Sequence, residues 1–155
     1  MELIDLLPEE HILIQLNETD KAKIFSSMLD CLTDSYSDMN KEEIIEALLA
    51  REKLGSPYLP CKLAVPHIRL QDIHKEIAVF ATLSKQVDFA EEEDSVPKPT
   101  QMVFLILSPE SRKKEYLMFL SRLSTIIGRN NTAGYLLRAK SPQEVRDIIL
   151  LAEQV

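Results

Sequence analysis

Glycine is scarce in this sequence, with only Gly55, Gly128 and Gly134 among 155 residues. Phosphate-binding P-loops and the dinucleotide-binding fingerprint each place several glycines at fixed spacing, because the backbone must approach the phosphates closely. Neither pattern occurs here, and neither does the G-x-S-x-G turn that exposes the serine of many hydrolases. The sequence therefore excludes three common kinds of nucleotide and hydrolase site.

Cysteine is equally scarce. Cys31 and Cys61 are too few for a disulfide framework. Cys61, His67 and His74 could suggest a metal site, but the gaps of five and six residues between them match no common zinc spacing. We therefore expect neither a bound metal nor a cofactor.

The sequence also has no excess of basic residues and no long apolar run. The formal net charge is −7 with a pI near 5.0, and no run of Lys and Arg is interleaved with aromatic residues, which argues against a nucleic-acid partner. The longest apolar run, at 102–107, is far too short to cross a bilayer, and the acidic first residues do not fit a signal peptide. We expect a cytoplasmic protein with no direct membrane insertion, and we interpret the acidic run at 91–94 as a solvated loop.

The composition is that of one ordinary globular domain spanning residues 1–155, with a hydrophobic share of 45%. β-Branched and apolar runs predict strands at 12–14, 77–83 and 102–107, with weaker candidates at 63–65 and 87–89. Helical spacing and capping residues predict helices that begin after Asn17 or Thr19, at Asn40, after Ser108-Pro109, near Asn130 and at Ser141. This order is not a strict alternation. It indicates an α/β fold (α+β by some schemes) with a mixed sheet of four or five strands and helices packed against it.

His67 has the local setting most typical of a functional residue. It follows Val65-Pro66 at the end of a short apolar run, where a rigid scaffold often presents site residues. A neutral imidazole is a competent nucleophile when its second nitrogen is hydrogen-bonded. Nearby cations could bind an anionic group: Arg51, Lys53, Lys62 and Arg69. The alternative is a hydrogen-bonded loop histidine without chemistry, and we interpret His11 and His74 as surface residues.

Two segments around this histidine resemble a known signature. Residues 51–56, with the sequence R-E-K-L-G-S, and 63–67, with the sequence L-A-V-P-H, are similar to the active-site pattern of the fructose/mannitol-type enzyme IIA domains. These domains belong to the phosphoenolpyruvate-dependent sugar phosphotransferase system, and the group includes the nitrogen-regulatory IIA proteins. The resemblance continues through four downstream segments, at 87–89, 102–109, 116–123 and 141–145.

The resemblance implies a phosphotransferase-system component that forms a phosphohistidine. His67 would accept a phosphoryl group from an HPr-like phosphocarrier protein, and would pass it to a IIB domain or hold it as a signal to a regulated target protein. Arg51 and Ser56 would bind the phosphate, and Tyr116 stands at the position of the family's second histidine in a supporting role. Because no IIB or membrane segment follows, we expect the nitrogen-regulatory type.

The sequence departs from the family pattern in the loop before His67. Pro57, Tyr58, Pro60 and Lys62 stand where the family has threonine and glycines, and Ile68 where it has glycine. Prolines bring no N–H donors to a phosphate. A second hypothesis is therefore a degenerate IIA fold that binds and regulates a protein partner without phosphoryl transfer. A third is an unrelated α/β protein with a chance resemblance.

Two further expectations concern the surroundings of His67. The strand at 102–107 should run beside the segment that leads to His67, so the next helix should bring the Tyr116 hydroxyl within reach of the imidazole. Tyr58, Leu59 and Ile68 could form an apolar patch for a protein partner, or they could pack within the loop.

Overall fold

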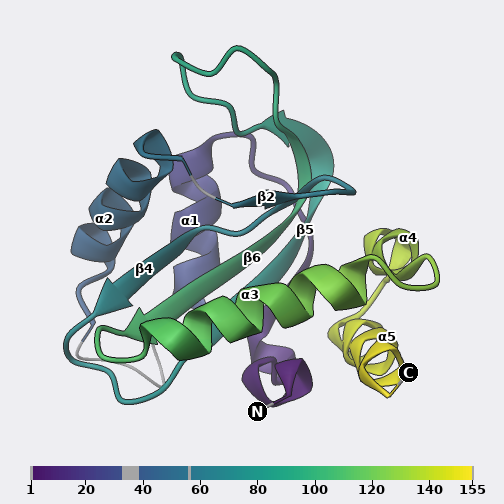
Figure 1. Ribbon diagram of the computed structural model, residues 1–155. Coiled ribbons are helices and arrows are strands. Elements are labelled where there is room, and N and C mark those ends of the chain that lie inside the picture. Colours follow the sequence, from purple (N-terminus) through teal and green to yellow (C-terminus); the bar gives the residue numbers. More distant parts are fainter. Residues whose placement is uncertain (1, 33–38, 56, 155) are drawn as a thin grey trace.

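The computed structural model describes residues 2–32, 39–55 and 57–154 (Figure 1). Two short 3-10 turns, Leu3–Leu6 and Glu9–His11, precede the first strand. The strands are β1 (Ile12–Leu16), β2 (Tyr58–Leu59), β3 (Leu63–Ala64), β4 (His67–Leu70), β5 (Ile77–Asp88) and β6 (Pro99–Pro109). The helices are α1 (Lys21–Asp30), α2 (Lys41–Lys53), α3 (Lys113–Ile127), α4 (Thr132–Arg138) and α5 (Pro142–Glu153).

The strands form one mixed sheet, as the sequence predicts. Its order is β1-β5-β6-β3-β2, and β4 pairs with β6 beyond the end of β3. β5 and β6 are antiparallel, whereas β3 and β4 both run parallel to β6. The sheet has six strands in the described residues, more than the sequence indicated, because the chain resumes pairing directly after Pro66. His67 is thus the first residue of a strand and does not lie in a loop.

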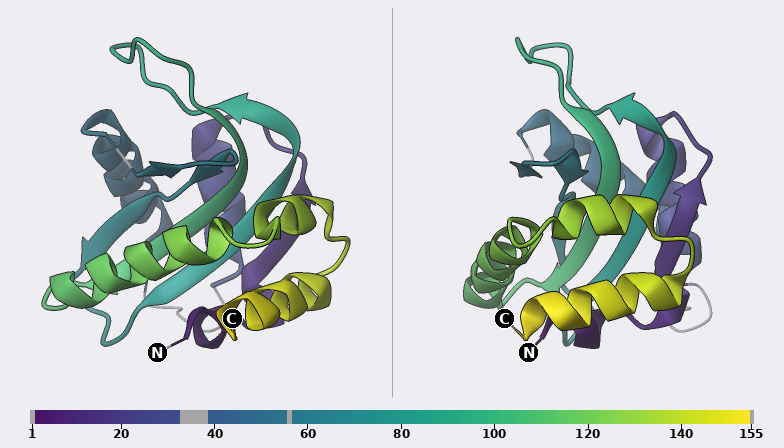
Figure 2. Two further views of the ribbon diagram at one scale, coloured as in Figure 1. Left: turned by 45° about the vertical axis from the view of Figure 1, so that its right-hand side comes forward. Right: turned by 90° about the vertical axis from the view of Figure 1, so that its right-hand side faces the viewer.

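Helices cover both faces of the sheet (Figures 1 and 2). α1 and α2 pack on one face, and α3, α4, α5 and the N-terminal turns pack on the other. The side chains of β6 alternate between the two layers. Met102, Phe104 and Ile106 join the core under α3, and Val103, Leu105 and Leu107 join the core under α2.

Side-chain caps fix three of the helix starts. Asn40 Oδ1 accepts from the Glu43 N–H at 3.1 Å, and Ser141 Oγ accepts from the Glu144 N–H at 3.1 Å, both as the sequence predicts. The start of α1 differs from the prediction. Asp20 caps it through the Lys23 N–H, instead of Asn17 or Thr19, because β1 continues to Leu16 and a connecting segment follows. In the sequence the helical pattern of this segment fades at 33–35, which lies outside the described residues, and the helix itself ends at Asp30.

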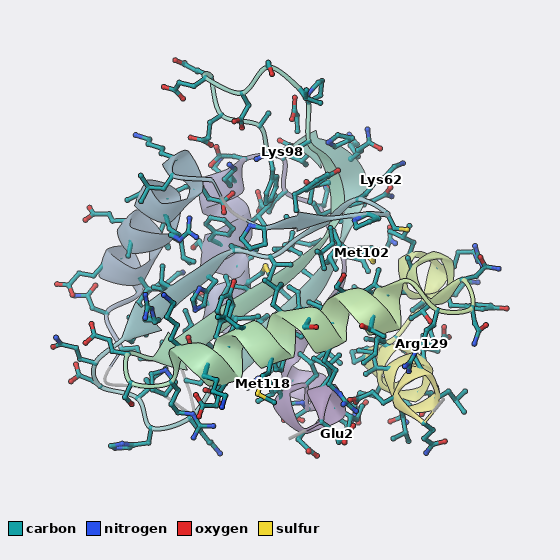
Figure 3. All side chains as sticks on the ribbon, in the orientation of Figure 1. Glu2, Lys62, Lys98, Met102, Met118 and Arg129 are labelled. Carbon is teal, nitrogen blue, oxygen red and sulfur yellow. The ribbon has the colours of Figure 1, made fainter. Side chains whose placement is uncertain are left out.

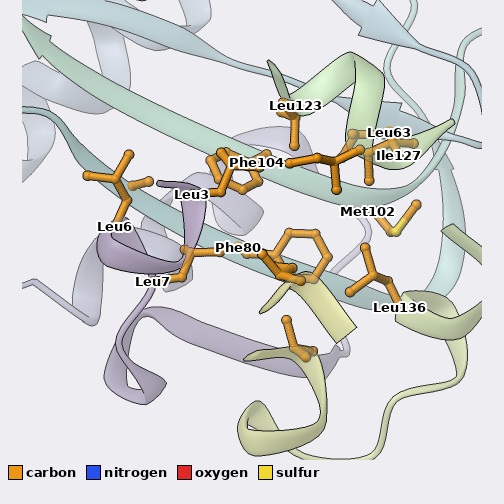
Figure 4. Packing of buried hydrophobic residues seen from close by; sticks show 14 of the residues in the cluster. Leu3, Leu6, Leu7, Leu63, Phe80, Met102, Phe104, Leu123, Ile127 and Leu136 are labelled. Carbon is orange, nitrogen blue, oxygen red and sulfur yellow. The ribbon is translucent and has the colours of Figure 1, made fainter. Parts of the chain in front are cut away.

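Three phenylalanines pack α3 against the sheet, and two of them, Phe80 and Phe104, are labelled in Figure 4. The ring of Phe104, on β6, lies 6.1 Å from that of Phe80 on β5 and 5.7 Å from that of Phe119 on α3, measured between centroids. Such tilted aromatic pairs are favourable beyond their buried area. The position of α3 over β6 therefore depends on Phe104.

We predict that Phe104→Ala lowers the free energy of unfolding by about 3–5 kcal/mol, because it leaves a cavity at the centre of this cluster. Urea titration followed by circular dichroism measures the change. The control is Leu151→Ala, whose side chain is 67% exposed and whose loss should cost less than about 0.5 kcal/mol. A similar, small loss in both variants would contradict the role given to Phe104.

Candidate functional site

His67 lies at the sheet edge between α2 and α3, and it is only 7% exposed. Its Nε2 atom shares a hydrogen bond of 2.8 Å with Ser108 Oγ. The two residues meet because β4 and β6 are parallel, with His67 opposite Ile106 and Arg69 opposite Ser108. These four side chains point to the α3 face of the sheet, since side chains alternate along a strand. Ser108, which is fully buried, thus fixes the orientation of the imidazole.

Tyr116 covers one face of this imidazole. The two rings are parallel within 7°, and their centroids are 3.5 Å apart. Tyr116 lies in the first turn of α3, and its side chain is buried. The sequence led us to expect a hydroxyl that reaches the imidazole, whereas the contact in the structure is between the ring faces. The stack and the Ser108 hydrogen bond together leave the imidazole little freedom to turn.

A crevice of about 640 Å³ opens above His67 between α2 and α3. Its charged lining residues are the cations Arg51, Arg69 and Lys113, and no carboxylate of the described residues lines it. None of the three forms an ion pair with another described residue. The Arg51 guanidinium donates to the carbonyl oxygen of Gly55 at 2.5 Å, which holds the segment after α2 close to the crevice. The geometry suits an anionic group placed next to the imidazole.

The environment keeps both aromatic residues uncharged at neutral pH. Burial, with the charges of Arg51 and Arg69, lowers the pKa of His67 from 6.5 to about 4. Burial also raises the pKa of the Tyr116 phenol above its usual value. A neutral imidazole offers a lone pair for attack, which a protonated one does not.

The end of α2 is held by a buried ion pair next to Arg51. Glu52 is 6% exposed, and its carboxylate lies 3.2 Å from Lys21 Nζ on α1. Lys21 also donates to the carbonyl oxygen of Phe89 at 2.8 Å and to Glu91 at 2.7 Å. These contacts join α1, α2 and the connection after β5. They fix the last turn of α2, and with it the position of Arg51.

The structure places the other predicted site residues as follows. Ser56 lies outside the described residues. Lys53 and Lys62 do not line the crevice, and Lys62 lies near the tip of the β2–β3 hairpin (Figure 3). Ser108 and Lys113, which do belong to the site, were not among the predicted residues. Only the abrupt end of the apolar run before Ser108 could have indicated the first of them.

The structure decides one alternative that the sequence left open and corrects one expectation. Ile68 is only 8% exposed and packs in the core under α2, while Leu59 packs against the opposite core and the Tyr58 hydroxyl donates to the Pro99 carbonyl oxygen. These residues therefore pack within the fold and form no exposed patch. His11 is not a surface residue, because it is buried and its Nδ1 atom bonds to the carbonyl oxygen of Ala78 at 2.9 Å.

No cluster of three or more His, Cys, Asp or Glu side chains suited to a metal occurs in the described part of the chain. In the same residues, we find no helix with the length and apolar character that a membrane span needs. The acidic run at 91–94 is part of the connection between β5 and β6, and two of its residues form ion pairs, Glu91 with Lys21 and Asp94 with Lys98.

Comparison with known proteins identifies relatives along almost the whole chain. The sequence is 28% identical over 151 residues to a nitrogen regulatory protein of Bradyrhizobium diazoefficiens, covering 97% of this chain and 96% of the relative. It is 26% identical to the fructose-specific EIIA component of Haloferax volcanii, covering 93% and 92%. The crystal structure of the nitrogen regulatory protein IIA-Ntr from Neisseria meningitidis superposes with a TM-score of 0.82 at 28% identity, covering 95% and 98%.

The family-wide sequence profile gives the same assignment. The profile described as phosphoenolpyruvate-dependent sugar phosphotransferase system, EIIA 2, matches residues 5–151. The matched region contains both signature segments around His67, all six strands, helices α1 to α4 and all but the last two residues of α5. The chain therefore belongs to the EIIA 2 family of the phosphoenolpyruvate-dependent sugar phosphotransferase system.

Proposed function

We propose that this chain is a phosphohistidine-accepting regulatory IIA protein, in which His67 receives a phosphoryl group from an HPr-like phosphocarrier. One observation carries the proposal. A neutral imidazole, held by Ser108 and Tyr116, forms the floor of a crevice whose other charged residues are Arg51, Arg69 and Lys113. A histidine whose only role is a hydrogen bond in the core would not need three neighbouring cations that form no ion pair with another described residue.

The proposed transfer is a direct displacement at phosphorus. An imidazole nitrogen of His67 forms a new N–P bond while the N–P bond to the donor breaks, and the donor histidine keeps the electron pair. Charge spreads over the phosphoryl oxygens in the transition state, so fixed cations accelerate the step. Arg51 supplies its charge from α2, Lys113 from α3, and Arg69 from β4, the strand that also carries His67.

Ser108 influences which imidazole nitrogen of His67 accepts the phosphoryl group. A hydroxyl donates to a lone pair or accepts from an N–H, so Ser108 holds either imidazole tautomer. Its hydrogen bond to Nε2 persists if the phosphoryl group is carried by Nδ1. Transfer to Nε2 requires the ring to break this bond and to move against the Tyr116 stack.

The relatives support a regulatory protein that works with other phosphotransferase components. Curated relatives include several nitrogen regulatory proteins and fructose-specific components. In Bacillus subtilis the matched relative is a fructose-specific EIIABC component, of which this chain covers 23%. We propose that the phosphorylated protein acts in the cytoplasm, where it passes its phosphoryl group to a IIB domain or signals to a regulated target.

The first test is phosphorylation itself. Incubation with phosphoenolpyruvate, enzyme I and an HPr-like carrier should add one phosphoryl group per chain, detected by intact mass spectrometry. The gain should disappear in acid, because N–P bonds are acid-labile, and His67→Ala should abolish it.

The matched control is His74→Ala, which removes an exposed histidine outside the crevice and should leave the gain unchanged. An acid-stable modification, or an unchanged gain in His67→Ala, would overturn the assignment. A complete absence of phosphorylation would support the alternative of a binding module without phosphoryl transfer.

The second test concerns the charge state of His67. Its NMR titration should have a midpoint near pH 4, so the imidazole is neutral above about pH 5. Arg51→Met removes one of the cations that disfavour protonation, so the midpoint should move up, while burial keeps it below 6.5. Lys85→Met, a change on an exposed part of β5, should leave the midpoint unchanged. A downward shift in Arg51→Met would contradict the electrostatic account.

The third test separates the ring of Tyr116 from its hydroxyl. Tyr116→Phe keeps the stacked ring, whereas Tyr116→Ala removes the contact that orients His67. We expect the rate of phosphoryl uptake to fall about tenfold or more in Tyr116→Ala, because small misplacements of a reacting group are costly. The rate should fall less in Tyr116→Phe, because this variant keeps the stacked ring. Equal losses would assign the effect to the hydroxyl instead of the stack.

A further inference from the structure

The surface around the crevice has a charge opposite to that of the chain as a whole. The net charge is −7, yet Arg51, Arg69 and Lys113 line the crevice and no carboxylate does. Lys114 continues this positive charge along α3, on the side of the helix that also carries Leu117 and Met118. Glu92 and Glu93 lie in the connection between β5 and β6. That connection projects from the upper end of the sheet in Figure 1, whereas α3 crosses its lower half.

Two carboxylates packed beside α3 have partners, and Glu115 on α3 itself lines the neighbouring groove with Arg112 and Met118, not the crevice. Glu153 lines the groove beside Lys114, and it accepts from Arg122 at 2.9 Å and from the N–H groups of Leu3 and Ile4. Glu76 is buried and pairs with Arg112 at 3.0 Å. The positive field at the crevice is therefore not cancelled by the acids packed next to the helix.

Exposed apolar side chains lie at the rim of the crevice and in the groove along α3 beside it. Leu54, at the end of α2, is 82% exposed, and Leu117 and Met118 on α3 are 53% and 64% exposed. Leu54 and Leu117 stand on opposite sides of the opening, and Met118 lies on the lower side of α3 in Figure 3. Single exposed apolar residues are ordinary, but a group around a polar site marks an interaction surface.

We propose that Leu54, Lys114, Leu117 and Met118 form a docking surface for a carrier protein that presents carboxylates and apolar side chains around its own phosphohistidine. This inference rests on the proposed function and names the chemistry of the partner. A nucleic acid would match the cations but not the apolar rim, and it would be repelled by the net negative charge. An acidic, partly apolar protein face matches both features and would be attracted over the Debye length before contact.

The test uses one HPr-like carrier prepared in two versions, with glutamates or with lysines at the same exposed positions around its phosphohistidine. At low ionic strength, the glutamate version should transfer its phosphoryl group to this protein about tenfold faster than the lysine version or more. The advantage should shrink as salt is added, because the attraction is screened. A faster lysine version, or equal rates at low salt, would overturn the proposal.

Matched variants assign the effect to the surface. Lys114→Glu should slow transfer from the glutamate version and flatten its salt dependence, whereas Lys85→Glu, the same change on β5, should not. Met118→Ser should slow transfer, whereas Leu151→Ser on α5 should not. If a variant and its control change the rate of transfer equally, this surface does not take part in docking. Binding of the protein to vesicles of anionic phospholipid that is lost in Lys114→Glu and Met118→Ser would instead assign the surface to a membrane.

A small phosphodonor separates this inference from the proposed function. Phosphoramidate should phosphorylate His67 at the same rate in the wild-type protein, Lys114→Glu and Met118→Ser, because no protein needs to dock. Failure of phosphoramidate to modify His67 would count against the proposed function. Modification by phosphoramidate without any preference for the acidic carrier would overturn only the docking inference.

Discussion

The buried strand β6 is the element on which the rest of the structure depends. From Met102 to Ser108 its residues are at most 1% exposed, and it pairs with β5 on one side and with β3 and β4 on the other. A strand buried on both faces has no water for its backbone, so each N–H and C=O must find a partner in a neighbouring strand. This requirement forces the chain after Pro66 back onto β6. The strand β4 and the position of His67 follow from it.

The site contains two buried residues and three cations that remain in contact with water. His67 and Ser108 are buried, and their hydrogen bond satisfies both. Arg51, Arg69 and Lys113 remain at the opening, where water screens their mutual repulsion. An anion that enters the crevice replaces part of this water and relieves the repulsion. Under the proposed function, the crevice therefore binds negative charge before any bond to phosphorus forms.

Local patterns in the sequence predicted much of the fold, because each rests on neighbours in the chain. The caps at Asn40 and Ser141 and the apolar strands at 77–83 and 102–107 are of this kind, and so is the family signature around His67. Features that depend on distant contacts were not predicted. β4 exists only because β6 is beside it, and Ser108 meets His67 only through the register of those two strands. Ile68 is buried only because α2 covers it.

Both edges of the sheet are short or irregular, and this has a consequence for assembly. β4 has four residues and follows Pro66, which offers no N–H. β1 is interrupted between Leu13 and Leu16, where Gln15 has a φ of 54° and its N–H donates to the Thr82 side-chain oxygen on β5 in place of a backbone carbonyl. Long, regular edges invite another chain to add a strand, whereas bulges and prolines prevent it. The short β4 and the interrupted β1 therefore offer another chain little regular edge to pair with, and the edge beside His67 stays open to a folded partner while it discourages strand addition.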